Sequence, residues 1–284
     1  MKATSSHEEP RVSSANGTPH PVEHRPAVAH TLDMERAAYS YVERANPAIR
    51  SLYAKHIAAH NSSPRVLDIG CGCGANDREF KKITPQAHIV GIEPNARAAE
   101  LAGRVCDEVF QGMLEDWLKR DVREPFDLVV LSDVLEHIAD PIAFLRALAQ
   151  APSVRHAQWI ISVPNYGVWY NRLRTLLGVQ GYSWSGIWDR THLRFFTRSS
   201  IRKLLTYCGM ELLDDACTPS IVQSTAPILR KAFERNVSEG DHLALADSRA
   251  YAAYQKAIEP VESLVCETWP ALLGLQIVHL TRLR

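Results

Sequence analysis

The stretch Val66-Leu-Asp-Ile-Gly-Cys-Gly-Cys-Gly74 decides the fold class. Residues 65–69 form a short apolar run typical of a buried strand, and glycines follow it at once. Glycines in that position let the backbone turn tightly and let a ligand approach where a Cβ would clash. A second strand is predicted over 87–93, and residues 75–84 are long enough for a helix between the two. The unit is therefore β-α-β, with parallel strands and a right-handed crossover.

The rest of the chain alternates between apolar runs of strand length and segments with helical spacing. Such alternation predicts an α/β fold, Rossmann-like and doubly wound, with a mostly parallel seven-stranded sheet and helical additions. Ser199 or Ser200 is expected near the cap of the last helix of this series. The further strands are expected at 108–111, 126–131, 159–163, 210–213 and 275–280, and the further helices at 97–101, 141–149 and 199–208.

The chain is expected to consist of one domain, residues 31–284, preceded by a disordered tail over residues 1–30. The tail is rich in Pro, Ser, His and charged residues and has no aromatic residue, which is typical of a segment that cannot bury a core. Within the domain we expect three additions to the minimal sheet: N-terminal helices over 31–62, an aromatic-rich insertion over 165–193 and a helical addition over 226–270.

Composition excludes several classes of protein. The 284 residues contain 32 Lys+Arg and 32 Asp+Glu, a balance that gives no reason to expect a nucleic-acid partner. No apolar run approaches the ~20 residues that span a bilayer, and the N-terminus lacks the apolar core of a secretory signal. Six cysteines match no disulfide framework and no zinc finger, so a reduced, cytoplasmic protein is expected.

The glycine loop fits two classes of ligand. Gly70-x-Gly72-x-x-Ala75 satisfies the dinucleotide pattern, and Glu93 lies 21 residues after Gly72, where a carboxylate can accept hydrogen bonds from a ribose. NAD and S-adenosylmethionine (SAM) both carry that ribose. Asp68, just before the glycines, suits a cationic ligand and repels a pyrophosphate. This residue therefore favours SAM.

Longer motifs make the chain resemble a family. It is similar to the class I SAM-dependent methyltransferases, in the branch related to the ubiquinone-type O-methyltransferases and to methyltransferases encoded beside glycosyltransferases. If the resemblance holds, residues 31–284 are a class I methyltransferase domain. The resemblance rests on VLDIGCGCG (66–74), VGIEPN (90–95), FDLVVLSDVLEHIADP (126–141), SVPN (162–165) and DRTHLRFFT (189–197).

The resemblance implies a role for each matching position. The methionine part of SAM would be lined by Asp68, Gly70, Cys71, Gly72 and Gly74. The ribose would be held by Glu93, and the adenine would lie near Pro94, Gly112, Met113 and Leu114. Many relatives have an acidic residue where Met113 stands, so the adenine contact departs from the pattern here. Ser132, Asp133 and His137 would lie beside the sulfonium and the acceptor.

Methyl transfer to a hydroxyl requires removal of its proton, so a histidine or carboxylate must lie close by. The candidates for catalysis are His137, His192 and Asp133. A structural role for either histidine is an open alternative. Asp133, Glu136 and His137 also match by type and spacing a divalent-cation cluster in ubiquinone-type relatives, but we expect a site without a metal.

The sequence thus predicts an enzyme, a SAM-dependent methyltransferase that acts on a small molecule, at a hydroxyl oxygen of a sugar or secondary metabolite. The main alternative is a SAM-binding regulatory or partner subunit without transfer activity. A nicotinamide-dependent oxidoreductase is disfavoured, because no hydride-handling set is found. The protein is expected to be a monomer or homodimer, with the aromatic insertion on the acceptor side.

Overall fold

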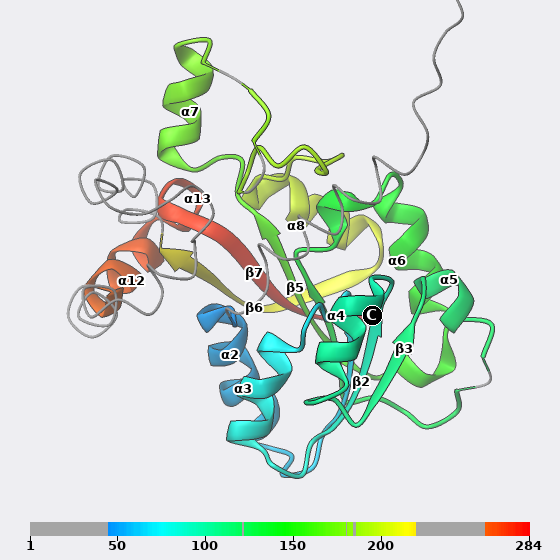
Figure 1. Cartoon of the computed structure of the whole chain (residues 1–284). Helices are drawn as coiled ribbons and strands as arrows, with labels where there is room; N and C mark the ends of the chain where they lie inside the picture. Colours follow the sequence, from blue (N-terminus) through cyan, green and yellow to red (C-terminus); the bar gives the residue numbers. More distant parts are fainter. Residues whose placement is uncertain (1–44, 121, 180, 184–185, 220–258) are drawn as a thin grey trace, which may run out of the picture.

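A single mixed sheet of seven strands organises the molecule (Figure 1). The computed structural model describes residues 45–120, 122–179, 181–183, 186–219 and 259–284. The strands are β1 (Arg65–Ile69), β2 (His88–Glu93), β3 (Glu108–Gln111), β4 (Leu128–Ser132), β5 (Gln158–Pro164), β6 (Met210–Pro219) and β7 (Gly274–Leu283). The expected tail over residues 1–30 lies outside the described residues, as do most of the positions in 226–270.

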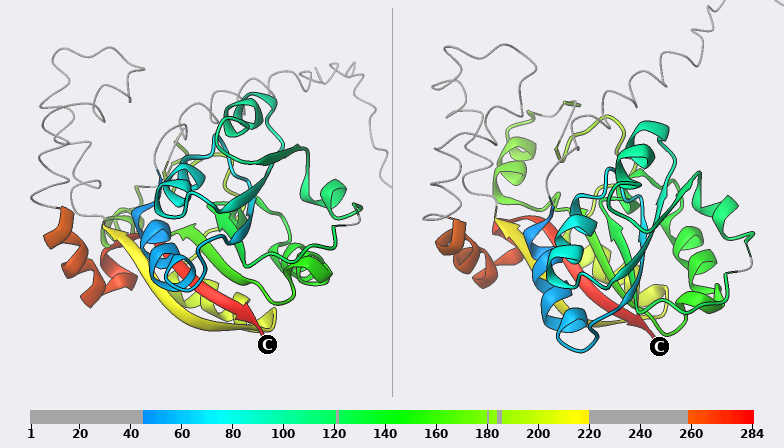
Figure 2. Two further views of the ribbon diagram at one scale, coloured as in Figure 1. Left: turned by 90° about the horizontal axis from the view of Figure 1, so that it is seen from below. Right: turned by 60° about the horizontal axis from the view of Figure 1, so that its bottom comes forward.

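The strand order in the sheet is β3-β2-β1-β4-β5-β7-β6. The first five strands pair in parallel, whereas β7 lies antiparallel between β5 and β6. Figure 2 shows β6 and β7 side by side at one edge of the molecule. The expected α/β, doubly wound, mostly parallel seven-stranded sheet is therefore confirmed.

Helices cover both faces of the sheet because the strands are apolar on both faces. One face packs against α2 (Pro47–Tyr53), α3 (Ala75–Ile83) and α4 (Ala96–Ala102). Across this layer Tyr53 stacks on Phe80, with ring centroids 4.1 Å apart. The other face packs against α5 (Leu114–Trp117), α6 (Pro141–Ala149) and α8 (Arg198–Tyr207).

Helix starts follow the local sequence. Asn46 caps α2 with its side-chain oxygen, and Pro47 occupies the first turn, where its missing N–H costs nothing. Asp140 caps α6 in the same way, ahead of Pro141. A serine near the cap of α8 is confirmed, and it is Ser200. The N-cap is Thr197, and Ser200 completes a reciprocal pair of hydrogen bonds with it.

The expected additions are partly described. Of the N-terminal helices, α2 is followed by a π-helical turn, Ala54–Ala58. The aromatic insertion contains α7 (Trp169–Leu176), which Figure 1 shows projecting from the main body. The helical addition ends in α12 (Glu259–Thr268) and α13 (Pro270–Leu273). Among the residues described, no helix is long and apolar enough to cross a bilayer.

Candidate cofactor and active site

The strand order gathers the predicted site residues at one edge of the sheet. Since β2, β1 and β4 are parallel neighbours, their carboxyl ends lie together. Asp68 and the glycine loop leave β1, Glu93 ends β2, and Asp133 follows β4. Such an edge, where the chain order reverses direction, is where doubly wound sheets bind ligands.

The glycine loop needs glycine for two different reasons. Gly70, Gly72 and Gly74 have φ of 72°, 55° and 76°, a region that favours glycine. A Cβ on Gly70 would also come within 2.7 Å of Val134 Cγ2. A Cβ on Gly72 would meet no described atom within 4 Å, so the backbone at this position faces open space. The loop thus offers bare backbone to a ligand.

Glu93 is fixed at the end of β2. Its Oε2 accepts the Gly72 N–H at 2.9 Å and its Oε1 accepts the Asn95 N–H at 2.8 Å. Burial raises the pKa of this carboxyl, and the two backbone donors act against that rise. Each oxygen keeps a further lone pair, so the carboxyl can still accept from two neighbouring hydroxyls. Pro94, beside it, is exposed and open to packing.

The other predicted cofactor residues occupy distinct environments. Cys71 is buried, and its sulfur lies against the Gly91 position on β2. Met113, the residue that departs from the family pattern, is 52% exposed at the start of α5. Leu114 is buried in the core, so a ligand at this edge would meet its backbone. Gly112 links β3 to α5 beside these residues.

Asp133 is held in an unusual backbone conformation. Its φ of 55° is the only positive value among the described non-glycine residues. Ser162 Oγ donates to Asp133 Oδ1 at 2.9 Å, and Gln276 Nε2 donates to Oδ2. Burial raises the pKa of the carboxyl to about 6, against the effect of these two donors. Strained conformations of this kind concentrate at functional sites. Ser132, just before it, is half-buried.

Gln276 belongs to a polar chain that sequence reasoning missed. Its Oε1 accepts Asn46 Nδ2 at 3.0 Å, while the Asn46 backbone N–H donates to Asn76 Oδ1 at 2.8 Å. These bonds join the start of α2, the start of α3, β7 and the turn after β4. Asp133 is therefore positioned in part by Gln276, which lies 143 positions away in sequence.

His137 and His192 lie side by side. Their ring centroids are 4.8 Å apart in an edge-to-face arrangement. His137 Nδ1 donates to the Thr191 carbonyl at 3.3 Å, and His192 Nδ1 donates to the Ile187 carbonyl at 3.1 Å. A carbonyl only accepts, so each neutral ring keeps its Nε2 as a proton acceptor. Burial lowers the pKa of both imidazoles, which leaves them neutral at pH 7.

Glu136 completes a cluster with the two histidines. One oxygen of Glu136 and one nitrogen of each ring lie within 4.8 Å of one another. Glu136 is 1% exposed, and within the described chain neither carboxylate oxygen has a hydrogen-bond partner. Burial, followed by Asp133 and Asp189, raises its pKa well above the usual range. In this group His192 takes the place that the sequence pattern gave to Asp133.

Backbone bonds hold the segment after the insertion against this cluster. The Leu193 and Arg194 N–H groups donate to the Glu136 carbonyl at 2.8 and 3.0 Å. Tyr166, Trp188 and Phe195 form a contiguous group of rings nearby, with centroids 5.1 to 5.7 Å apart. Phe195 directly follows Arg194, so its backbone is held close to Glu136. Trp184 lies outside the described residues.

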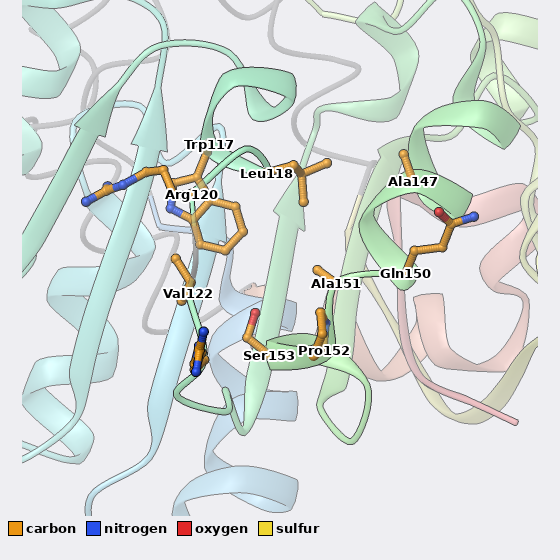
Figure 3. Close-up of a pocket in the computed structure, with 10 residues that line it drawn as sticks. Trp117, Leu118, Arg120, Val122, Ala147, Gln150, Ala151, Pro152 and Ser153 are labelled. Carbon is orange, nitrogen blue, oxygen red and sulfur yellow. The ribbon is translucent and has the colours of Figure 1, made fainter.

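A hollow in the described surface lies away from this edge of the sheet. Figure 3 shows this cavity of about 490 Å³, lined by Trp117, Arg120, Gln150 and Ser153 among others. The Ser153 carbonyl accepts the backbone N–H of Phe126, two residues before β4 begins. The hollow therefore lies at the amino ends of the strands, and its place gives no support for a role in the predicted chemistry.

Comparison with known proteins agrees with the geometry. A family model described as a methyltransferase domain matches residues 41–214. The ubiquinone biosynthesis O-methyltransferase of Rhodopseudomonas palustris (strain BisB18) is 33% identical over 91 residues, 31% of this chain and 35% of that protein. The mitochondrial ubiquinone biosynthesis O-methyltransferase of Bos taurus is 28% identical over 142 residues, 44% and 38% of the two chains. The match thus spans little more than a third of either relative.

Solved structures agree on the fold. The plantazolicin methyltransferase BpumL, in complex with a pentazolic desmethylPZN analog and S-adenosylhomocysteine (SAH), superposes with a TM-score of 0.54 at 17% identity. That alignment covers 91% of this chain and 94% of BpumL. The [4+2]-cyclase SpnF gives 0.50 at 17% identity, over 82% and 80% of the two chains. The fold therefore carries more than one reaction. With the family model over more than half of its length, the chain belongs to the class I SAM-dependent methyltransferases, in a branch related to the ubiquinone O-methyltransferases.

Proposed function

We propose that the protein transfers a methyl group from SAM to a small-molecule acceptor, at a hydroxyl oxygen of a sugar or secondary metabolite. One observation carries the proposal. Two imidazoles, the half-buried His137 and the buried His192, meet at the edge of the sheet that also holds the glycine loop and Glu93. A neutral imidazole beside the cofactor site can accept the proton of an acceptor hydroxyl.

The residues at the carboxyl edge fit the cofactor. The open space at Gly72 admits a chain that a Cβ would obstruct. Asp68 is 1% exposed, and its Oδ1 has no partner in the described part of the chain, which suits the methionine ammonium group. The fixed carboxyl of Glu93 suits the ribose hydroxyls, and the exposed Pro94 and Met113 suit the adenine.

SAM supplies, when bound, a methyl carbon on a sulfonium that a nucleophile displaces in line. The protein's part is to align the acceptor, to exclude water and to take its proton. Nε2 of His137 or His192 accepts that proton, since each Nδ1 is engaged with a carbonyl. The rings of Tyr166, Trp188 and Phe195 offer an apolar wall for the acceptor.

Binding tests the cofactor site. We expect SAH to bind the full chain in calorimetric titration, and Asp68→Ala and Glu93→Ala to weaken binding at least tenfold. Asp116→Asn, at an exposed acid of α5, is the matched control and should bind as the parent does. Preference for NAD(H) over SAH would contradict the proposal.

Turnover tests the acceptor side. With SAM and a panel of hydroxylated small molecules, His137→Gln and His192→Gln should lower kcat, and loss of the group that acts as the base should cost about 10²- to 10⁴-fold. His156→Gln, at an exposed histidine that is not among the predicted site residues, should leave kcat unchanged. SAH binding without turnover on any acceptor would favour the alternative, a SAM-binding partner subunit without transfer activity.

Metal removal tests the expectation of a metal-free site. We expect activity to survive treatment with a chelator, because burial favours the neutral form of Glu136 and a neutral carboxyl is a weak ligand. Loss of activity, with recovery on adding one divalent cation, would instead assign an ion to Glu136, His137 and His192.

A further inference from the structure

A second buried carboxyl lies directly beneath the cofactor loop. Asp77, in the first turn of α3, is 0% exposed, and its side chain is hydrogen-bonded to that of Asp68, which is 1% exposed. Ionised carboxylates only accept hydrogen bonds, so the two groups share a proton. Within the described chain, one oxygen of each carboxyl still lacks a partner.

The groups around Asp68 and Asp77 are acidic or weakly acidic. The Cys106 thiol donates to Asp77 Oδ2 at 3.3 Å from the segment between α4 and β3. Cys71, in the loop above, lies within 4.8 Å of both that sulfur and the Asp77 carboxyl. Glu93, from β2, adds a further negative charge near Asp68.

The nearest cation does not compensate these groups directly. Lys81, one turn further along α3, has its ammonium on both oxygens of Asp107, at 3.0 and 2.8 Å, and on the Ala87 carbonyl at 2.7 Å. Among the residues described, Asp68 and Asp77 therefore have a proton between them and no cation in contact.

We propose that Asp68 and Asp77 form a two-carboxyl seat for the α-ammonium group of the cofactor, and that binding of this group expels the proton that they share. The proposal rests on the proposed function. Asp68 is the binding group and Asp77 the positioning residue that holds it. The ammonium keeps its own N–H protons and donates them to the oxygens that lack partners, while the shared proton passes to solvent.

Electrostatics supports an exchange of proton for ammonium. Burial, followed by repulsion from Asp77, raises the pKa of Asp68 well above its usual range. Burial alone raises the pKa of Asp77 to about 6, against the lowering effect of its hydrogen bonds to Cys106 and Asp68 and of the charge on Lys81. A cation within ~4 Å lowers a carboxyl pKa by about 1 to 3 units. The N-terminus of α3 also stabilises negative charge at Asp77. Together these effects favour ionisation of both carboxyls once the cofactor is bound.

The experiment counts protons. The full chain is titrated with SAH at pH 7 in phosphate and in Tris, whose ionisation enthalpies differ, so that the difference in binding enthalpy gives the protons released per site. We expect about one. 5′-Methylthioadenosine, which has the adenine and ribose but no amino-acid portion, should release about none. Because this control ligand also carries the ribose expected at Glu93, the difference between the two ligands excludes any proton that Glu93 releases.

Variants assign the proton to the pair. In Asp77→Asn the amide N–H can still donate to Asp68, but the pair no longer shares a proton that binding could expel. The affinity for SAH should therefore stay within about tenfold of the parent's, while proton release disappears. Parental affinity should fall by up to tenfold per unit as pH drops from 7 to 5.5, whereas the variant's should stay flat. Asp116→Asn is the control for a changed acid and should behave as the parent does.

The failures are distinguishable. If SAH binds the parent with no release of protons, the pair does not exchange its proton and this inference is overturned, while the cofactor site stands. Proton release that survives Asp77→Asn overturns it equally. Absence of SAH binding to the parent contradicts the proposed function itself. If Asp77→Asn proves unstable, the proton count of the parent with the two ligands still decides.

Discussion

At the scale of single residues, the site depends on where protons are held. His137 and His192 direct each Nδ1–H at a backbone carbonyl, which fixes the tautomer and leaves Nε2 as the basic atom. Asp133 differs from them, because Ser162 and Gln276 donate to its two oxygens. We infer that the imidazoles take the acceptor's proton and that Asp133 orients polar groups around it.

The pH dependence of turnover follows from this assignment. A base acts in its neutral form, and burial lowers the pKa of His137 and His192 below the ordinary value of 6.5. The rate should therefore hold as pH falls to 6.5 and decline only at lower pH, once the histidines gain a proton. Measurement of kcat/KM from pH 5 to 9 checks this. An acidic limb centred above 6.5 would be incompatible with a buried histidine base.

At the scale of elements, the start of helix α8 depends on a capping box formed by Thr197 and Ser200. Thr197 Oγ1 accepts the Ser200 N–H at 3.2 Å and Ser200 Oγ accepts the Thr197 N–H at 2.9 Å. Thr197→Ala should lower the free energy of unfolding by about 1 kcal/mol. Ser199→Ala, at an exposed position one residue before Ser200, should change it by less than about 0.5 kcal/mol. Urea unfolding of both variants gives the comparison, and equal losses of unfolding free energy would show that Thr197 does not cap the helix.

Most elements could be predicted because their signals are local. Apolar runs located the parallel strands to within two residues, and Asp140 with Pro141 marked the start of α6. Strand β6 was predicted only to residue 213, yet it continues to Pro219. Asp214 and Asp215 break the apolar pattern there, because they bind Lys55 and Arg198 across the edge of the sheet.

The site could be predicted where motifs are contiguous and not where contacts are distant. The glycine loop and Glu93 lie 21 positions apart, on neighbouring strands. Gln276 reaches Asp133 across 143 positions, and no spacing in the sequence indicates that pairing. The role of Asp77 could not be predicted for another reason. An acid in the first turn of a helix is ordinarily exposed to solvent, where it interacts favourably with the helix dipole.

At the scale of the whole molecule, a buried histidine makes stability depend on pH. His279, in β7, is 0% exposed, and neither ring nitrogen has a partner in the described chain. Burial lowers its pKa to about 4. The unfolded chain therefore takes up a proton at this residue near pH 6.5 while the folded one does not, so stability is full above 6.5 and falls as pH drops toward 4.

The size of this effect can be measured. Between pH 7 and pH 5 the linkage amounts to about 2 kcal/mol of unfolding free energy. His279→Leu should remove that part of the pH dependence, so that the unfolding free energy of the variant rises relative to that of the parent as pH falls. Urea unfolding at pH 7 and at pH 5 gives the comparison. A difference between the two proteins that is the same at both pH values would show that His279 does not titrate in this way.

The antiparallel place of β7 has a consequence for synthesis. Because β7 lies between β5 and β6, β6 has no neighbour in the sheet until residues 274–283 have been made. On the ribosome, one edge of β5 and all of β6 emerge as unpaired strands, the surfaces on which nascent chains aggregate. The same strand delivers Gln276 to Asp133. The sheet is therefore completed, and Asp133 gains its hydrogen bond from Gln276, in one step late in the synthesis of the chain.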